Sequence, residues 1–94
     1  MYVAYALVSE RDGTLYIGHS EDVQRRVKEH NAGKTRSTRK GRPYRLFYYE
    51  EFNTLEKAIT REHQLKRGCG REYLKEILFR SKNSGDGTVL ESRL

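Results

Sequence analysis

The sequence predicts an α+β protein, in which a small three-stranded antiparallel sheet is flanked by helices in the order β-β-α-β-α-α. Two observations predict this class. Three segments rich in Tyr, Val, Leu and Phe have the composition of strands, and three others repeat apolar residues at the spacing of a helix face. The chain has 94 residues, which suffices for one compact domain and not two.

The first two predicted strands form a hairpin. Residues 2–9 have strand composition, Asp12-Gly13 is a strong turn signal, and residues 14–18 form the returning strand. A two-residue turn would place Ser9 opposite Tyr16, whereas another loop length would shift this register. With the two-residue turn, one face of the hairpin carries Tyr5, Leu7, Tyr16 and Gly18.

The first helix is predicted to run from an N-cap at Ser20 to about Asn31, with Gly33 as its stop. Glu21 and Asp22 fall in its first turn, where acidic side chains are favourable. Its inward stripe is formed by Val23, Val27 and His30, and Arg26 flanks this stripe.

A third strand is predicted over residues 44–52, and a second helix follows with Asn53 or Thr54 as its cap. The inward face of this helix carries Leu55, Ala58, Ile59, Glu62 and Leu65. An inward ionised carboxylate costs several kcal/mol unless it is paired or metal-bound. Glu62 therefore either binds a metal ion or pairs with Lys66, four residues later.

The C-terminal part of the chain is predicted to contain one more helix and a tail. Gly68-Cys69-Gly70 is expected to break the chain, and residues 71–80 form the last helix. Residues 81–94 are polar and aperiodic, which predicts a flexible tail. The domain is accordingly expected to span residues 1–80.

Cysteine usage and hydropathy bear on the compartment. Cys69 is the only cysteine, so no disulfide can form within the chain and a reducing compartment is expected. No apolar run approaches the ~18 residues that a membrane-spanning helix needs. The N-terminus also lacks the pattern of a signal peptide. We therefore expect a cytoplasmic protein without a membrane partner.

Positive charge is concentrated in one segment, residues 24–43, which we call the basic window. It holds eight basic residues and one acidic residue, a net charge of +7 against +6 for the whole chain. Such clustering favours a phosphate-binding face, although a solvated surface is the alternative. The predicted nucleic-acid-binding residues in this window are Arg25, Lys34, Arg36, Arg39, Lys40 and Arg42.

Two spaced motifs resemble a known nuclease family. Val3-Ala4-Tyr5 and, ten residues later, Tyr16-Ile17-Gly18 are similar to the paired motifs of the GIY-YIG nuclease superfamily, although Val3-Ala4 replaces the usual Gly-Ile. Arg26 and Glu62 stand where that family carries an arginine and a metal-binding glutamate. The likeness extends over about residues 2–78 and is strongest to small stand-alone bacterial members, which resemble the N-terminal nuclease domain of the repair protein UvrC.

The resemblance implies a role for each site residue. Tyr5 would be the general base, Tyr16 would hydrogen-bond beside it, and His30 would position water or a tyrosine. Arg26 would hold the scissile phosphate, with His19 near it. Glu62 would bind one divalent cation, Mg²⁺ or Mn²⁺. The implied activity is metal-dependent endonucleolytic hydrolysis of DNA, with RNA as an alternative substrate and with repair or recombination as the expected setting.

Two other functions compete with the nuclease. A non-catalytic nucleic-acid-binding module would retain the basic window and bind in a salt-sensitive way without cleavage. A protein-interaction domain would bind no nucleic acid near physiological salt. Neither alternative needs all of Tyr5, Tyr16, Arg26 and Glu62, so their joint presence favours the enzyme.

Overall fold

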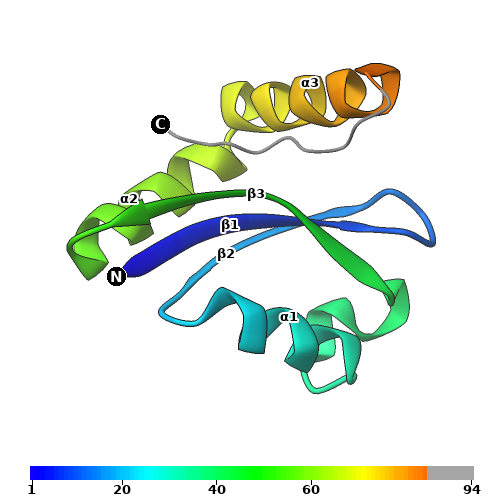
Figure 1. Ribbon diagram of the computed structural model, residues 1–94, viewed down its shortest axis with the longest axis horizontal. Coiled ribbons are helices and arrows are strands. Elements are labelled where there is room, and N and C mark those ends of the chain that lie inside the picture. Colours follow the sequence, from blue (N-terminus) through cyan, green and yellow to red (C-terminus); the bar gives the residue numbers. More distant parts are fainter. Residues whose placement is uncertain (85–94) are drawn as a thin grey trace.

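The structure is a computed structural model that describes residues 1–84 (Figure 1). Its element order confirms the predicted β-β-α-β-α-α, with a short 3-10 helix, η1, before the third strand. No helix in this part of the chain combines the length and apolar character that crossing a bilayer requires. The elements are β1 (Tyr2–Ser9), β2 (Leu15–Ser20), α1 (Val23–Asn31), η1 (Arg36–Gly41), β3 (Tyr44–Phe52), α2 (Leu55–Lys66) and α3 (Gly68–Ser84).

The sheet has the strand order β2-β1-β3, and both pairings are antiparallel. The central strand β1 is covered on both faces, which is why its side chains from Val3 to Ser9 are all buried. Figure 1 shows α2 and α3 on one side of the sheet and α1 with η1 on the other. The sheet therefore separates two apolar clusters.

Alternate residues of β1 contribute to the two clusters. Ala6 and Val8 pack with Ile17 of β2 against Leu65 of α2 and Leu74 of α3. On the opposite face the cluster is built from Val3, Tyr5, Leu7 and Tyr44, against which Tyr16, Val23, Val27 and Leu46 pack. The predicted stripe of α1 is confirmed, and its side chains pack the helix against the face of the sheet that bears Tyr5 and Tyr16.

The hairpin loop is longer than two residues, so the register differs by two residues from the one that a two-residue turn would give. Tyr16 pairs with Leu7 rather than Ser9. The Ser9 hydroxyl accepts hydrogen bonds from the backbone N–H groups of Arg11 and Asp12, at 3.0 and 3.1 Å, and so extends the loop. Gly13 closes the loop at φ +81°. A two-residue shift preserves the alternation of faces, so Tyr5 and Tyr16 still share one face.

The predicted caps of the first two helices are partly corrected. Asp22, and not Ser20, caps α1, since its side chain accepts from the Arg25 N–H, so that no acidic residue lies in the first turn. Ser20 instead accepts a hydrogen bond from the Asp22 N–H. Thr54 caps α2 as one of the two expected residues. The prediction that Leu55 belongs to the inward stripe is wrong, because Leu55 is 42% exposed and the buried part of the stripe begins at Ala58.

The predicted break at Gly68-Cys69-Gly70 is also wrong, because these residues form the first turn of α3. The chain turns at Arg67, whose backbone is extended (φ −80°, ψ 167°). A Cβ at Gly70 would overlap the Gln64 carbonyl oxygen, so glycine permits the close approach of the two helices. α3 continues through Ser84, into the segment predicted as the tail, and residues 85–94 lie outside the described residues.

Candidate active site

Two tyrosines define the candidate site on the α1 side of the sheet. Tyr5 comes from the centre of β1 and is 1% exposed, and Tyr16 comes from β2 with its ring centroid 6.3 Å away. Gly18 lies opposite Tyr5 in the register. A Cβ at Gly18 would lie 3.0 Å from the Tyr5 hydroxyl and 3.2 Å from the Tyr16 ring. The missing side chain therefore leaves room for both phenol rings.

His30 of α1 joins the two tyrosines. It is completely buried, its Nε2 lies 3.3 Å from the Tyr5 hydroxyl oxygen, and its ring centroid lies 4.6 Å from that of Tyr16. The other ring nitrogen, Nδ1, lies 2.8 Å from Oγ1 of Thr38 in η1. The structure thus brings together three of the predicted site residues and adds Thr38.

Burial sets the protonation of this group. It raises the pKa of Tyr5 to about 12, with a further contribution from Tyr16, and the positive charge of Arg26 only partly opposes this. Burial and then the charge of Arg26 lower the pKa of His30, against Glu29. Tyr5 is therefore a neutral phenol and His30 a neutral imidazole near pH 7. Arg26 does not by itself produce a phenolate.

Arg26 lies on α1 at the edge of this group. Its side chain is 34% exposed, and Nη1 donates to Oε1 of Glu29 at 2.9 Å. That hydrogen bond is the largest reason why the pKa of Arg26 is raised, which keeps the guanidinium charged. Since its charge also acts on Tyr5 and Tyr16, Arg26 is placed to hold an anion beside the phenols.

Glu62 of α2 lies in a separate, adjacent group. Its side chain is 12% exposed, with Oε1 2.5 Å from Nδ1 of His19 and Oε2 2.7 Å from Nζ of Lys66. The predicted pairing with Lys66 is therefore confirmed. Burial alone would raise the pKa of Glu62, but the hydrogen bonds from His19 and Lys66 outweigh it and lower that pKa. The carboxylate is ionised at neutral pH.

The two groups occupy opposite faces of the sheet. His19 pairs with Ala4 in the register, which places it on the α2 side, whereas Tyr5 and Tyr16 face α1. They remain electrostatically linked, because the charge of Glu62 contributes to the raised pKa of Tyr5. Of the predicted catalytic residues, Tyr5, Tyr16 and His30 lie against one another and Arg26 lies beside them, whereas Glu62 lies on the other face of the sheet.

The donor set at Glu62 fits a weakly held hard cation. Within the described residues, no three His, Cys, Asp or Glu side chains gather in a way that would enclose a metal ion. Mg²⁺ does not need such a cage, because it usually keeps several waters and takes one or two carboxylates plus substrate phosphate. Both oxygens of Glu62 already contact a basic side chain, so a cation bound there would have to displace Lys66 from Oε2.

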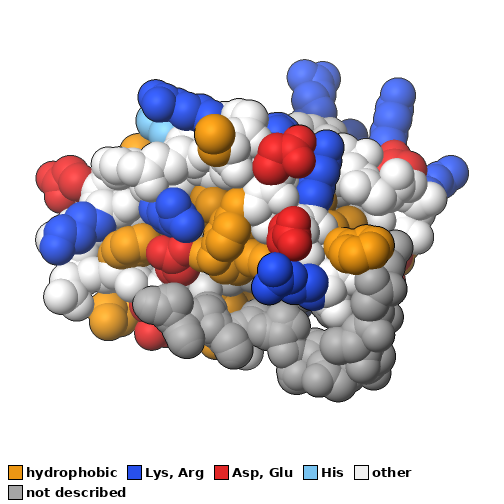
Figure 2. Space-filling view, turned by 90° about the horizontal axis from the view of Figure 1, so that it is seen from above, with side chains coloured by type: hydrophobic (Ala, Val, Ile, Leu, Met, Phe, Trp, Pro, Cys, Tyr) orange, Lys and Arg blue, Asp and Glu red, His pale blue; other side chains and the backbone are white. Residues whose placement is uncertain are grey.

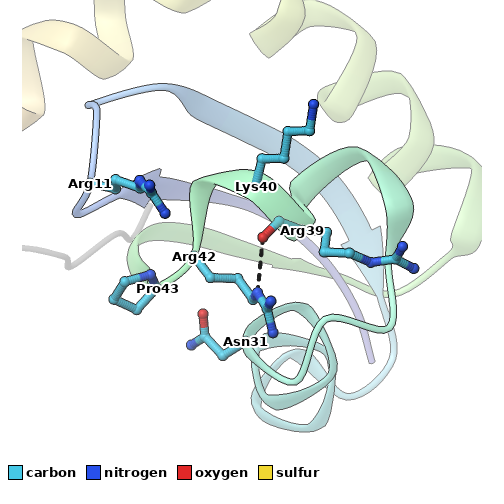
Figure 3. Close-up of a pocket in the computed structure, with 6 residues that line it drawn as sticks. All are labelled: Arg11, Asn31, Arg39, Lys40, Arg42 and Pro43. Carbon is cyan, nitrogen blue, oxygen red and sulfur yellow. Dashed lines mark hydrogen bonds between the residues drawn. The ribbon is translucent and has the colours of Figure 1, made fainter.

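The basic window surrounds a hollow of about 720 Å³, which we call the basic hollow (Figure 3). In Figure 3 Arg11 and Arg42 lie beside it, whereas the side chains of Arg39 and Lys40 extend outward. Nε of Arg42 donates to the Arg39 carbonyl oxygen at 2.9 Å, which fixes the guanidinium. The hollow is lined by Arg11, Asn31, Arg39, Lys40, Arg42 and Pro43.

The cations of this region differ in their pairing. Arg25 contacts Asp22 and Glu29 and is exposed. Within residues 1–84, the structure shows no carboxylate within 4.0 Å of Lys34, Arg36, or any basic residue that lines the hollow. These cations are free to meet an external anion, as the predicted nucleic-acid-binding role of Lys34, Arg36, Arg39, Lys40 and Arg42 would require.

Sequence reasoning missed Thr38 and Arg11. Thr38 lies eight residues after His30 in a segment without periodicity, and no pattern indicated that η1 would fold back over α1. Arg11 belongs to the hairpin loop, far from the basic window in sequence. The positions of both residues depend on loop conformation, for which the sequence carries no periodic signal.

Comparison with known proteins gives a consistent result. Residues 1–73 match the family model described as the GIY-YIG catalytic domain. A UPF0213 protein of Staphylococcus saprophyticus is 36% identical over 72 residues, which cover 76% of this chain and 88% of the relative. One of Halobacterium salinarum is 46% identical over 69 residues, covering 72% and 87%. The solution NMR structure of a UPF0213 protein of Bacillus halodurans aligns with a TM-score of 0.49 and 34% identity, covering 81% of this chain and 84% of that one.

Proposed function

The chain belongs to the GIY-YIG family of catalytic domains, and from this premise we propose that it is a divalent-metal-dependent endonuclease that hydrolyses phosphodiester bonds in DNA. The observation that carries the proposal is the buried Tyr5 hydroxyl, which lies 3.3 Å from Nε2 of a neutral His30 with Tyr16 and Arg26 beside it. This arrangement offers a proton acceptor next to an anion-binding group. DNA repair or recombination is the setting that we propose for it.

Tyr5 would act as the general base in concert with His30. As water attacks the phosphorus, its proton passes to the Tyr5 oxygen while the Tyr5 proton passes to His30 Nε2. Tyr5 stays neutral throughout, which suits a phenol whose pKa burial raises to about 12. The bond to the leaving oxygen breaks, and that oxygen takes a proton from solvent. His30 returns its extra proton to Tyr5, and Tyr5 releases the proton that it took from water to solvent.

Arg26 and Tyr16 would bind the scissile phosphate. A partly exposed guanidinium next to the phenols can donate to two phosphate oxygens and stabilise the charge that develops there. Arg26 would exchange or share its hydrogen bond to Glu29 when the phosphate binds. Tyr16, which is half-buried beside His30, would hydrogen-bond to the same group or to the attacking water.

Glu62 would hold one Mg²⁺ or Mn²⁺, with Lys66 giving up its contact to the carboxylate. When bound, such a cation supplies positive charge at the phosphate and the leaving oxygen. His19 would keep Glu62 oriented through Oε1. The basic hollow and the window around it would contact the DNA backbone away from the scissile bond.

The proposal is tested by nicking of supercoiled plasmid and cleavage of branched oligonucleotides in Mg²⁺ or Mn²⁺. The two site variants are Tyr5→Phe and Glu62→Gln, and each has a matched control. Tyr49→Phe changes the residue opposite Tyr5 on β3, which is 38% exposed, and Glu56→Gln changes an exposed acid of the same helix as Glu62. We expect the cleavage rate of both site variants to fall by at least about 100-fold, while both control variants keep the wild-type rate.

Other outcomes of this experiment would assign a different function to the protein. If the wild type bound DNA with an affinity that falls with salt but did not cleave it, the protein would be a nucleic-acid-binding module and not a nuclease. If the wild type neither bound nor cleaved DNA, the result would favour a protein-interaction domain. Full activity of Glu62→Gln alongside an inactive Tyr5→Phe would keep the nuclease but remove Glu62 as the metal ligand.

A further inference from the structure

Thr38 is a buried polar residue to which neither the family motifs nor the mechanism above gives a role. It lies in η1, within the basic window, and is 1% exposed. Its Oγ1 lies 2.8 Å from Nδ1 of His30. The same hydroxyl donates to the Thr35 carbonyl oxygen at 3.4 Å, and the Thr38 N–H donates to that carbonyl at 3.2 Å. Thr38 thus connects the basic segment to the histidine behind Tyr5.

The two contacts of the Thr38 hydroxyl favour one position for the proton of His30. A threonine hydroxyl has one proton to donate. The Nδ1–H tautomer satisfies both contacts of Oγ1, because Nδ1 then donates to Oγ1 while the hydroxyl proton is directed at the Thr35 carbonyl. In the opposite tautomer the hydroxyl must donate to Nδ1, and its contact with the Thr35 carbonyl is left without a proton. A neutral imidazole carries one N–H, so in the Nδ1–H tautomer Nε2 is left with a lone pair. This lone pair faces the Tyr5 hydroxyl at 3.3 Å.

The opposite tautomer would prevent the proton transfer. With its hydrogen on Nε2, His30 would donate to the Tyr5 oxygen, use up a lone pair that the proton of water needs, and leave the Tyr5 proton without an acceptor. Nothing in the packing of the His30 ring itself separates the two tautomers, since both have the same shape. The hydrogen bond to Thr38 does separate them, and both partners are shielded from water that would replace it.

We propose that Thr38 is a positioning residue that holds His30 in the Nδ1–H tautomer and thereby makes Nε2 the acceptor of the Tyr5 proton. The catalytic consequence rests on the proposed nuclease function, whereas the tautomer does not. The competing explanation is that Thr38 only fills space between α1 and η1. The two explanations differ in whether loss of the hydroxyl, at constant side-chain volume, changes the proton position on His30.

The test is ¹⁵N NMR of histidine-labelled protein at pH 8, where long-range ¹H–¹⁵N correlations distinguish the protonated ring nitrogen from the unprotonated one. We expect the wild type to show protonated Nδ1 at His30. Thr38→Val keeps the shape but removes the hydroxyl, and should give the Nε2–H form or a mixture. Thr38→Ser should restore Nδ1–H. Thr35→Val is the control, because it is a neighbouring threonine that contributes to this network only its backbone carbonyl.

Cleavage kinetics provide the second readout. Thr38→Val should lower kcat about tenfold or more, the scale seen when the outer partner of a functional histidine is lost, with KM little changed. Thr38→Ser should recover most of the rate. A wild type with Nε2–H, or a His30 tautomer that is the same in the wild type and Thr38→Val, would overturn the proposal. The wild-type spectrum alone can do so if the valine variant does not fold.

The two proposals fail in different ways. If the wild type cleaves no nucleic acid but its His30 tautomer depends on Thr38 as expected, the nuclease function fails and the positioning role of Thr38 stands. If the wild type cleaves and Thr38→Val alters neither the tautomer nor kcat, the nuclease stands and Thr38 is only a packing residue.

Discussion

At the scale of single residues, His30 is where burial and charge act most directly on protonation. Folding removes its ring from water, and burial together with the charge of Arg26 lowers its pKa from 6.5. The unfolded chain takes up a proton on this residue near pH 6.5, but the folded chain resists it. The contribution of the neutral His30 to the free energy of unfolding is therefore complete above pH 6.5, and it is lost as the pH falls below that value.

This linkage gives a test of the buried, neutral histidine. The free energy of unfolding, measured with urea at pH values from 8 to 5.5, should decrease toward the acid end. In His30→Gln this dependence on pH should become flatter, whatever the absolute stability of the variant. His63→Gln, which changes an exposed histidine of α2, should keep the wild-type dependence. An equal slope in the wild type and His30→Gln would show that His30 is not the group responsible.

The site residues differ in how far sequence could place them. Tyr5 and Tyr16 were assigned to one face correctly although the register is not that of a two-residue turn, because strand faces repeat every two residues and the difference was two. His30 and Arg26 followed from helical spacing, which is insensitive to where a helix begins. Thr38 was out of reach, since its position depends on the path of a loop with no periodic signal.

At the scale of elements, the junction between α2 and α3 shows why glycine composition misleads. Two glycines within three residues predicted a break, yet both lie in the first turn of α3. Their environments differ, because a Cβ at Gly68 would have no atom within 4 Å, whereas one at Gly70 would overlap the backbone at Gln64 and Leu65. Only tertiary packing, which sequence spacing does not contain, distinguishes a glycine required for contact from one that ends a helix.

The pair makes a matched experiment on this packing. Gly70→Ala should lower the free energy of unfolding by about 1–3 kcal/mol, because α3 must move away from the end of α2. Gly68→Ala should be neutral or raise it by up to about 1 kcal/mol, since alanine is the better helix former. Urea unfolding of both variants measures the difference. Equal effects would show that the close approach at Gly70 does not stabilise the helix pair.

At the scale of the whole molecule, charge is distributed unevenly between the two sides. The face seen in Figure 2, on the side of α2 and α3, mixes acidic and basic side chains around apolar ones. Cations of α2 and α3 are neutralised locally, as Arg61 is by Glu50 and Arg80 by Glu76. The basic window lies on α1 and η1, on the other side of the sheet. The net charge of +6 therefore acts mainly from one side.

This asymmetry predicts which cations determine the salt dependence of DNA binding. Each phosphate contact contributes about 0.9 to the slope of log K against log salt. Arg11→Gln combined with Arg42→Gln, in the basic hollow, should reduce the slope by up to about two and weaken binding of all sequences alike. Arg45→Gln combined with Arg80→Gln removes the same formal charge from arginines already paired with Glu10 and Glu76.

The control pair should leave the slope nearly unchanged, because paired cations have few counterions to exchange for DNA phosphates. Fluorescence anisotropy with a labelled duplex at several salt concentrations, using Glu62→Gln protein to prevent cleavage, measures both slopes. Thermal melts check that each double variant is folded. If the two pairs reduced the slope equally, net charge alone would drive binding, and the basic hollow would have no role as a separate DNA contact.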